Sequence, residues 1–149
     1  GMRRASELPF IKDIFQIGLR GVGSGREEDM NAALQYGANL ISAYEVHDIG
    51  IEAILQRVPS GGSFYITVDA DGMDPTVMPA VNAPTPGGLT WLQIREFIHG
   101  IVNKGRVLGI DLVEISPQFE KGNITFIHAE RLLCNFIGAT VRADYFEDK

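Results

Sequence analysis

Three carboxylates directly follow an apolar stretch near the middle of the chain. Residues 64–68 (Phe-Tyr-Ile-Thr-Val) predict a buried strand, and Asp69, Asp71 and Asp74 come after it. Because side chains alternate between the two faces of a strand, Asp69 and Asp71 are predicted to point the same way, with Cα atoms about 6.6 Å apart. Two ionised carboxylates this close repel each other unless a cation lies between them. Since oxygen ligands suit Mg²⁺, Mn²⁺ or Ca²⁺, the sequence predicts a metal site on Asp69 and Asp71 at the carboxyl end of the strand.

Two other kinds of site use acidic clusters of this type. An EF-hand loop beginning at Asp69 would need glycine at position 74 and glutamate at position 80, where the chain has Asp74 and Ala80. The Asp-x-Asp-Gly sequence also resembles that of haloacid-dehalogenase-type phosphatases, in which Asp69 would be the nucleophile and Asp71 the acid. That motif expects threonine or valine at position 73, where this chain has Met73. The EF-hand is excluded, and the phosphatase is kept as an alternative.

The elements that must position these carboxylates alternate between strands and helices. Strands are predicted at 14–19, 39–44, 63–69 and 107–113, and helices at 24–36, 46–58, 90–102 and 125–141. Ser24 is the expected N-cap of the first helix, with Glu27 at the reciprocal position, Gly37 is expected to end it, and Thr90 is expected to cap the third helix. This order predicts an α/β protein with three layers, in which a mainly parallel sheet of about four strands carries helices on both faces.

Two loops contain glycine and proline in patterns that are typical of binding sites. Residues 70–89 contain four prolines, and a loop of this length in a compact domain is usually either functional or disordered. The prolines favour an ordered loop that shapes a site. Gly21, Gly23 and Gly25 lie between a strand and a helix, as in dinucleotide sites, but position 26 is arginine where the third glycine should be. A tight strand–helix connection is therefore favoured there.

The composition describes an ordinary globular domain. With 149 residues, 45% apolar and 21% charged, the chain is predicted to form one domain, 1–149, with irregular segments at 1–12 and 144–149. The net charge of −6 disfavours nucleic acid and anionic membrane surfaces as partners, and no apolar run is long enough to span a membrane. The single cysteine, Cys134, fits a reducing cytoplasm. It lies in an apolar helical stretch, which predicts a buried structural thiol.

The loop as a whole carries a more specific pattern. The sequence Asp69-x-Asp71-x-x-Asp74-Pro75-x-x-x-Pro79, followed by Thr85-Pro86-x-Gly88, resembles the ureohydrolase family of arginases, agmatinases and guanidinobutyrases. Residues 16–21 (Gln-Ile-Gly-Leu-Arg-Gly) resemble the family's preceding strand, and residues 109–117 (Gly-Ile-Asp-Leu-Val-Glu-Ile-Ser-Pro) resemble its last strand. Thr125 begins what resembles the closing helix, so the resemblance covers essentially the whole chain.

The resemblance implies a role for each residue of the acidic site. Asp69 and Asp71 match two ligands of a binuclear Mn²⁺ centre, in which Asp69 bridges the metals and Asp71 holds one of them. Asp74, with Pro75 and Gly88, matches the loop that supports the site, and Asp74 is not a ligand. Glu114 matches the glutamate that binds the guanidinium group, since a carboxylate accepts the paired N–H groups of a planar cation.

The reaction implied by the resemblance is the hydrolysis of a small linear guanidine. In the family, the metals lower the pKa of a shared water, which attacks the guanidinium carbon and releases urea and an amine. Arginases carry an aspartate after the segment that matches Leu19-Arg20, and this aspartate contacts the amino acid end of arginine. The chain has Gly21-Val22-Gly23 there, which favours substrates of the agmatine or 4-guanidinobutyrate type.

Two motifs of the family are missing from the chain. Gly-Gly-Asp-His and Asp-Ala-His-x-Asp supply the remaining metal ligands and lie in the family's N-terminal half, and neither occurs here. His47, His99 and His128 stand in neither context, and the family's catalytic histidine is missing with that half, so we assign no catalytic residue to this chain. The resemblance is therefore to the C-terminal half of a ureohydrolase and to half of an arginase-like fold.

The missing half also affects the predicted sheet. In the resembled fold, the strand with the Asp-Ala-His-x-Asp motif lies between the first two strands here and the last two. Either the gap closes or another chain fills it, and free strand edges with exposed apolar surface favour a homo-oligomer. Two carboxylates alone hold Mn²⁺ weakly, so little or no turnover is predicted for this chain by itself. The alternative is a non-catalytic remnant that acts only as an oligomerising or binding subunit.

Overall fold

Strands and helices alternate along the chain, which confirms the predicted α/β class. The computed structural model describes residues 1–21, 25–143 and 145. In chain order the elements are α1 (Met2–Ala5), β1 (Phe15–Leu19), α2 (Glu27–Tyr36), β2 (Asn39–Ser42), α3 (Ala43–Arg57), β3 (Ser63–Asp69), η1 (Ala70–Gly72), α4 (Trp91–Lys104), β4 (Arg106–Val113), η2 (Pro117–Phe119) and α5 (Ile124–Arg142).

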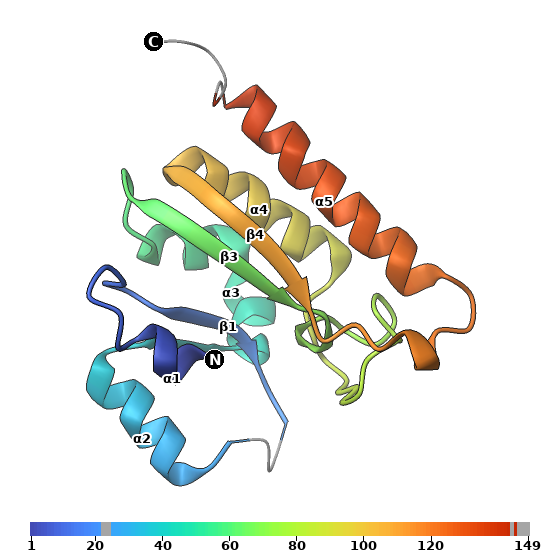
Figure 1. Ribbon diagram of the computed structural model, residues 1–149, viewed down its shortest axis with the longest axis horizontal. Helices are drawn as coiled ribbons and strands as arrows, with labels where there is room; N and C mark the ends of the chain where they lie inside the picture. The colour runs from blue at the N-terminus through green and yellow to red at the C-terminus, as the bar shows by residue number, and fades with distance from the viewer. Residues whose placement is uncertain (22–24, 144, 146–149) are drawn as a thin grey trace.

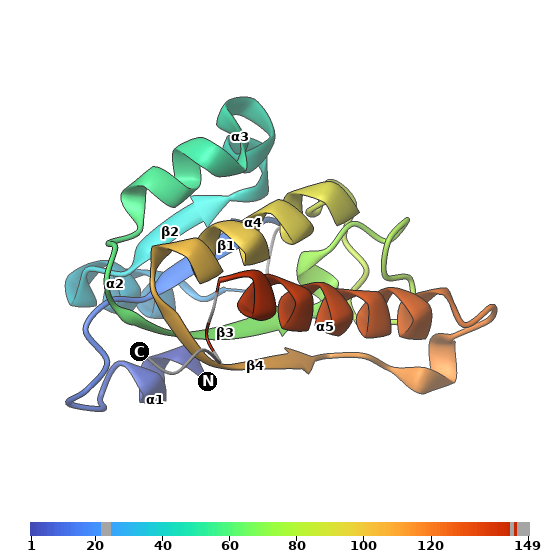
Figure 2. The same ribbon diagram turned by 90° about the horizontal axis from the view of Figure 1, so that it is seen from above.

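The strands of the described residues are parallel, as predicted, but they form two separate pairs and not one continuous sheet of four. β1 pairs with β2, and β3 pairs with β4, with Asp69 opposite Val113 at the carboxyl end. β1 is the strand of its pair that lies nearer β3 in both ribbon views (Figures 1 and 2), but no ladder joins the two within the described residues. The gap that the missing family strand would leave is therefore not closed by direct pairing.

The helices cover the two strand pairs unequally. α3 packs on β1 and β2 and contacts α4, while α1 and α2 lie on the other side of this pair (Figure 2). α4 packs on β4, and α5 lies against α4, so both helices are on one face of the β3–β4 pair. No described segment covers the opposite face at Tyr65 of β3, which is 63% exposed, or at Leu108 of β4, which is 67% exposed.

A single apolar cluster joins these layers. Buried side chains of α3, β3 and α4 meet those of the long loop after β3, including Met73 and Met78, which are almost completely enclosed. Burying a side chain of this size contributes roughly 1.5–3 kcal/mol relative to its exposed state. The loop therefore belongs to the core, which confirms the prediction that it is ordered.

Local sequence signals set most of the helix ends. Gly37 ends α2 with φ of 86°, and Thr90 begins α4 in a reciprocal capping box with Gln93, as predicted. Ser42 caps α3 by accepting a hydrogen bond from the Glu45 amide, which ends β2 two residues earlier than expected. The proposed cap Ser24 lies outside the described residues, and the residue at the N-cap of α2 is Arg26, without a side-chain hydrogen bond.

Two further predictions are wrong. Residues 2–5 are helical, so the segment 1–12 is not wholly irregular; of the segment 144–149, only Tyr145 is described. Cys134 is exposed and not buried. The reason is that α5 turns Ala129, Leu132 and Ala139 toward the core, and this leaves a second apolar face in solvent. That face contains Phe126, Ile127, Leu133, Ile137 and Val141.

None of the helices within the described residues is both long enough and apolar enough to cross a membrane.

Candidate metal centre at the strand ends

Asp69 and Asp71 come together through a turn and not through strand alternation. β3 ends at Asp69, and residues 70–72 form one turn of 3₁₀-helix, so the predicted alternation stops before Asp71. We call residues 69–73 the acidic turn. Asp69 is the N-cap of this turn, and its Oδ1 accepts a hydrogen bond from the Asp71 amide at 3.1 Å. The two carboxylates are close enough for the charge of Asp71 to affect the pKa of Asp69.

The electrostatics of the site destabilise the ionised form of Asp69. Its pKa is raised to about 6, first by partial burial of the carboxyl group and then by the charges of Asp71 and Glu114, against the opposing hydrogen bond from the Asp71 amide. No ion pair to these three carboxylates is present among the described residues. A perturbed carboxylate without a cation is typical of a functional site, and a divalent cation would reverse the shift.

The raised pKa of Asp69 predicts how the stability of the metal-free chain depends on pH. A folded-state pKa of about 6, above an unfolded value near 3.9, means that ionisation costs the folded state stability. The free energy of unfolding should therefore rise as the pH falls through 6 toward about 4. Urea unfolding at about pH 7.5 and about pH 5 measures this, with Asp69→Asn as the reference. If the difference between the two proteins is the same at both pH values, the shift at Asp69 is refuted.

Glu114 reaches the same edge from the neighbouring strand. Val113 lies opposite Asp69 in the β3–β4 ladder, and Glu114 follows it directly. Its backbone has φ of 61°, the left-handed region, which costs a non-glycine residue roughly 1–2 kcal/mol. Strained backbone of this kind concentrates at functional sites, where the side-chain direction is more important than local stability. Glu114 is exposed, and its charge raises the pKa of Asp69, so its carboxylate lies within electrostatic range of Asp69.

Asp74 differs from these carboxylates because its oxygens are already occupied. Its Oδ1 accepts hydrogen bonds from the amide and the hydroxyl of Thr76, at 3.0 and 2.6 Å, and its Oδ2 accepts one from the Gly87 amide at 2.9 Å. These bonds, the Thr76 hydroxyl foremost, hold the pKa of Asp74 below its usual value. Pro75 follows in a turn closed by the Val77 amide on the Asp74 carbonyl. Asp74 thus ties the start of the loop to its end.

Gly88 and His47 complete the closure of this loop. Gly88 is buried, and a Cβ there would lie 2.5 Å from the Asp74 nitrogen and 2.6 Å from the Met73 oxygen, so only glycine fits. Nε2 of His47 donates to the Gly88 carbonyl at 3.1 Å, and its Nδ1 accepts from the Gln93 side chain at 3.2 Å. Nothing in the sequence indicates this contact of His47.

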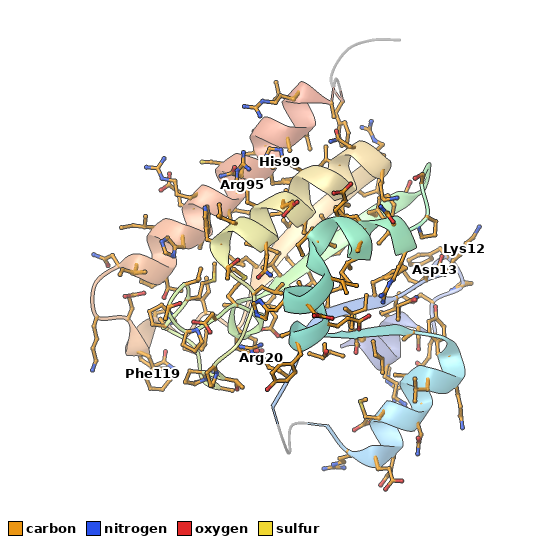
Figure 3. All side chains as sticks on the ribbon, turned by 180° about the vertical axis from the view of Figure 1, so that it is seen from behind. Lys12, Asp13, Arg20, Arg95, His99 and Phe119 are labelled. Atoms are coloured by element: carbon orange, nitrogen blue, oxygen red, sulfur yellow. The ribbon has the colours of Figure 1, made fainter. Side chains whose placement is uncertain are left out.

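The other histidines lie away from the acidic turn. Nδ1 of His128 binds the Val77 carbonyl at 2.6 Å and its ring packs on Trp91, while Nε2 of His99 is buried between α4 and α5 (Figure 3). In the part of the chain that the structure describes, no three His, Cys, Asp or Glu side chains form a group able to hold a metal ion. The edge therefore brings together Asp69, Asp71 and Glu114, but it is not a complete metal cage.

Solved structures define the class of fold to which this arrangement corresponds. The agmatine ureohydrolase of Thermoplasma volcanium is 33% identical and superposes with a TM-score of 0.80, over 97% of this chain and 47% of its own. The arginase of Bacillus subtilis, at 21% identity and a TM-score of 0.72, shares the fold over 83% of this chain and 44% of its own. The chain thus has about half of an arginase-type α/β fold.

The family model described as the arginase family matches residues 1–138, and the chain belongs to this family. The guanidinobutyrase of Pseudomonas aeruginosa is 35% identical over 149 residues, which are 94% of this chain and 46% of that protein. The agmatinase of Chromobacterium violaceum is 32% identical over 104 residues, which are 68% of this chain and 32% of that protein. The chain spans less than half the length of these relatives.

Proposed function

We propose that the chain carries the carboxylate part of a binuclear Mn²⁺ site that hydrolyses a linear guanidine to urea and an amine. The observation that supports this most directly is the cluster of Asp69, Asp71 and Glu114 at adjacent strand ends, where the pKa of Asp69 is raised to about 6. Membership of the arginase family points to the same chemistry. The phosphatase alternative has no observation in its favour once the family is known.

The donor set fits the metal. Carboxylate oxygens are the ligands that Mn²⁺ prefers in proteins, and those of Asp69 and Asp71 are free of ion pairs to described residues. Asp69 and Asp71 would hold the metal, and the 3₁₀ turn keeps Asp69 oriented. When bound, Mn²⁺ lowers the pKa of a bound water and so supplies a nucleophile near neutral pH. Glu114 would accept the N–H groups of the guanidinium and orient its carbon toward the acidic turn.

The substrate class follows from the relatives and from the loop after Arg20. Relatives include a guanidinobutyrase and a guanidinopropionase of Pseudomonas aeruginosa, each 35% identical. We propose a small guanidine of the 4-guanidinobutyrate or agmatine type, in a cytoplasmic protein.

Groups outside this chain must complete the site. Among the described residues, no three His, Cys, Asp or Glu side chains form a group able to hold a metal ion. β1 and β3 are unpaired with each other, Tyr65 and Leu108 are exposed, and Oδ1 of Asp111 on β4 is enclosed without a hydrogen-bond partner among the described residues. These features, with the apolar outer face of α5, support an oligomer or a complementary half of the fold over the sheet. We therefore expect little turnover from the chain alone.

The experiment is a calorimetric titration of the Mn²⁺-loaded chain with 4-guanidinobutyrate, with urea release measured in parallel. We expect saturable binding of 4-guanidinobutyrate and a dissociation constant at least tenfold larger in Glu114→Gln, because the neutral amide loses a charge-assisted, paired hydrogen bond. Arginine and agmatine serve as competing ligands. Equal binding by Glu114→Gln would contradict the substrate role, and phosphate release from a phosphoester with Mg²⁺ would favour the phosphatase.

A further inference from the structure

Arg20 is the most heavily hydrogen-bonded side chain at this edge. It lies just beyond the carboxyl end of β1, beside the loop that follows β3 (Figure 3). Its Nη2 donates to the carbonyls of Asp71 at 2.7 Å, Thr85 at 2.6 Å and Met73 at 3.1 Å. Over longer distances, Nη1 donates to the carbonyls of Gly18 and Gly72, and Nε donates to those of Thr85 and Pro86.

The acceptors of Arg20 belong to the two arms of the loop. Asp71, Gly72 and Met73 belong to the acidic turn, and Thr85 and Pro86 belong to the returning arm of the loop. Hydrogen bonds of Asp74 and Leu89 also connect the two arms. A planar guanidinium can bind both arms at once because its five N–H groups point in different directions within one plane. Arg20 therefore joins β1 to both arms across the gap where β1 and β3 do not pair.

A short path leads from Arg20 to the candidate ligands. Nη2 of Arg20 fixes the Asp71 carbonyl, and with it the orientation of residue 71 in the turn. The Asp71 amide in turn donates to Oδ1 of Asp69 at 3.1 Å. The direction of both carboxylates thus depends on a turn that Arg20 holds from the β1 side.

We propose that Arg20 is a positioning residue for the metal site: it clamps the carbonyls of the acidic turn to the returning arm of the loop and so fixes the carboxylates of Asp69 and Asp71. This proposal rests on the proposed function for its metal-binding consequence, but the clamp itself is a property of the metal-free chain. Lysine cannot replace arginine here, because its side chain is one bond shorter than the path to Nη2, so its single ammonium group would lie too far from the Asp71 and Thr85 carbonyls to bind both.

The first test substitutes Arg20→Lys, with Arg95→Lys as the matched control. Arg95 is exposed on α4, where Figure 3 shows it away from the loop. In Arg20→Lys we expect hydrogen exchange of the Asp71, Asp74 and Leu89 amides to rise at least tenfold, while the core amides of Ile66 and Ile98 are unchanged. Titration with Mn²⁺ alone should show at least tenfold weaker binding. Wild-type exchange in the loop together with wild-type Mn²⁺ affinity would overturn the proposal.

A second measurement needs no substitution and holds even if Arg20→Lys fails to fold. In the wild-type chain, the Arg20 Nε–H donates to the Thr85 and Pro86 carbonyls, so its exchange with water should be at least tenfold slower than that of Arg95. Equal exchange rates at the two side chains would refute the clamp. If the wild-type chain binds no Mn²⁺ while Arg20 is protected, the clamp holds and the proposed function fails, so the two failures are distinguishable.

Discussion

Replacing Asp69 with asparagine should weaken Mn²⁺ binding on the order of a hundredfold and at the same time stabilise the metal-free chain near neutral pH. A hundredfold loss corresponds to about 2.7 kcal/mol, a size consistent with removing one charged ligand from a site that has two. The stabilisation is expected because ionising Asp69 costs the folded state stability, as its pKa of about 6 indicates. Asparagine keeps the oxygen that accepts the Asp71 amide, so the turn is preserved.

Opposite effects on metal binding and stability distinguish a ligand from a structural carboxylate. Titration calorimetry with Mn²⁺ and urea unfolding at neutral pH measure the two quantities. Asp48→Asn, at an exposed site on α3, is the matched control and should change neither. An Asp69→Asn protein that is less stable and binds Mn²⁺ normally would assign Asp69 to the loop scaffold, where Asp74 lies.

Gly88→Ala should lower the free energy of unfolding by about 3 kcal/mol, which corresponds to a melting temperature lower by roughly 6–12 °C. The added methyl group would lie 2.5 Å from the Asp74 nitrogen and 2.6 Å from the Met73 oxygen. Both are backbone atoms at the start of the loop, so the clash cannot be relieved by a side-chain rotation. The returning arm must move away and break the Gly87–Asp74 hydrogen bond. Thermal unfolding measures the loss.

Gly138→Ala is the matched control for this prediction, with the opposite sign. Gly138 lies within α5, and a Cβ there would meet nothing within 4 Å. Alanine should therefore stabilise the chain by about 0.5–1 kcal/mol, because it restricts the unfolded backbone and favours the helix. Equal stabilities of Gly88→Ala and the wild type would show that the loop has room for a side chain, contrary to the packing described here.

The sequence predicted the parts of the fold that depend on local signals. The capping box of Thr90, the stop at Gly37 and the strand before Asp69 all follow from a few adjacent residues. The metal site on Asp69 and Asp71 stays a prediction, and the strand geometry assumed for it was wrong. Strand alternation ends at Asp69, and a capped turn brings Asp71 back toward it.

Contacts between distant segments could not be predicted in this way. Arg20 and His47 bind backbone carbonyls of the loop, and any residue can present a carbonyl, so no side-chain pattern identifies the partner. The exposed Cys134 and the split into two strand pairs have another cause. The apolar pattern of α5 and the edges of β1 and β3 specify more contacts than this chain can make, whereas the prediction assumed that every apolar position is covered.

The central claim is that the edge formed by Asp69, Asp71 and Glu114 is built to hold a divalent metal. The most direct test is to add Mn²⁺ alone to the isotope-labelled chain and to follow paramagnetic broadening of each amide. We predict that the amides of residues 69–74 and 113–115 broaden first, and that Asp69→Asn abolishes this selectivity. Broadening that begins instead at the acidic first turn of α2, Glu27 to Asp29, or that spreads evenly over the surface, would contradict the claim.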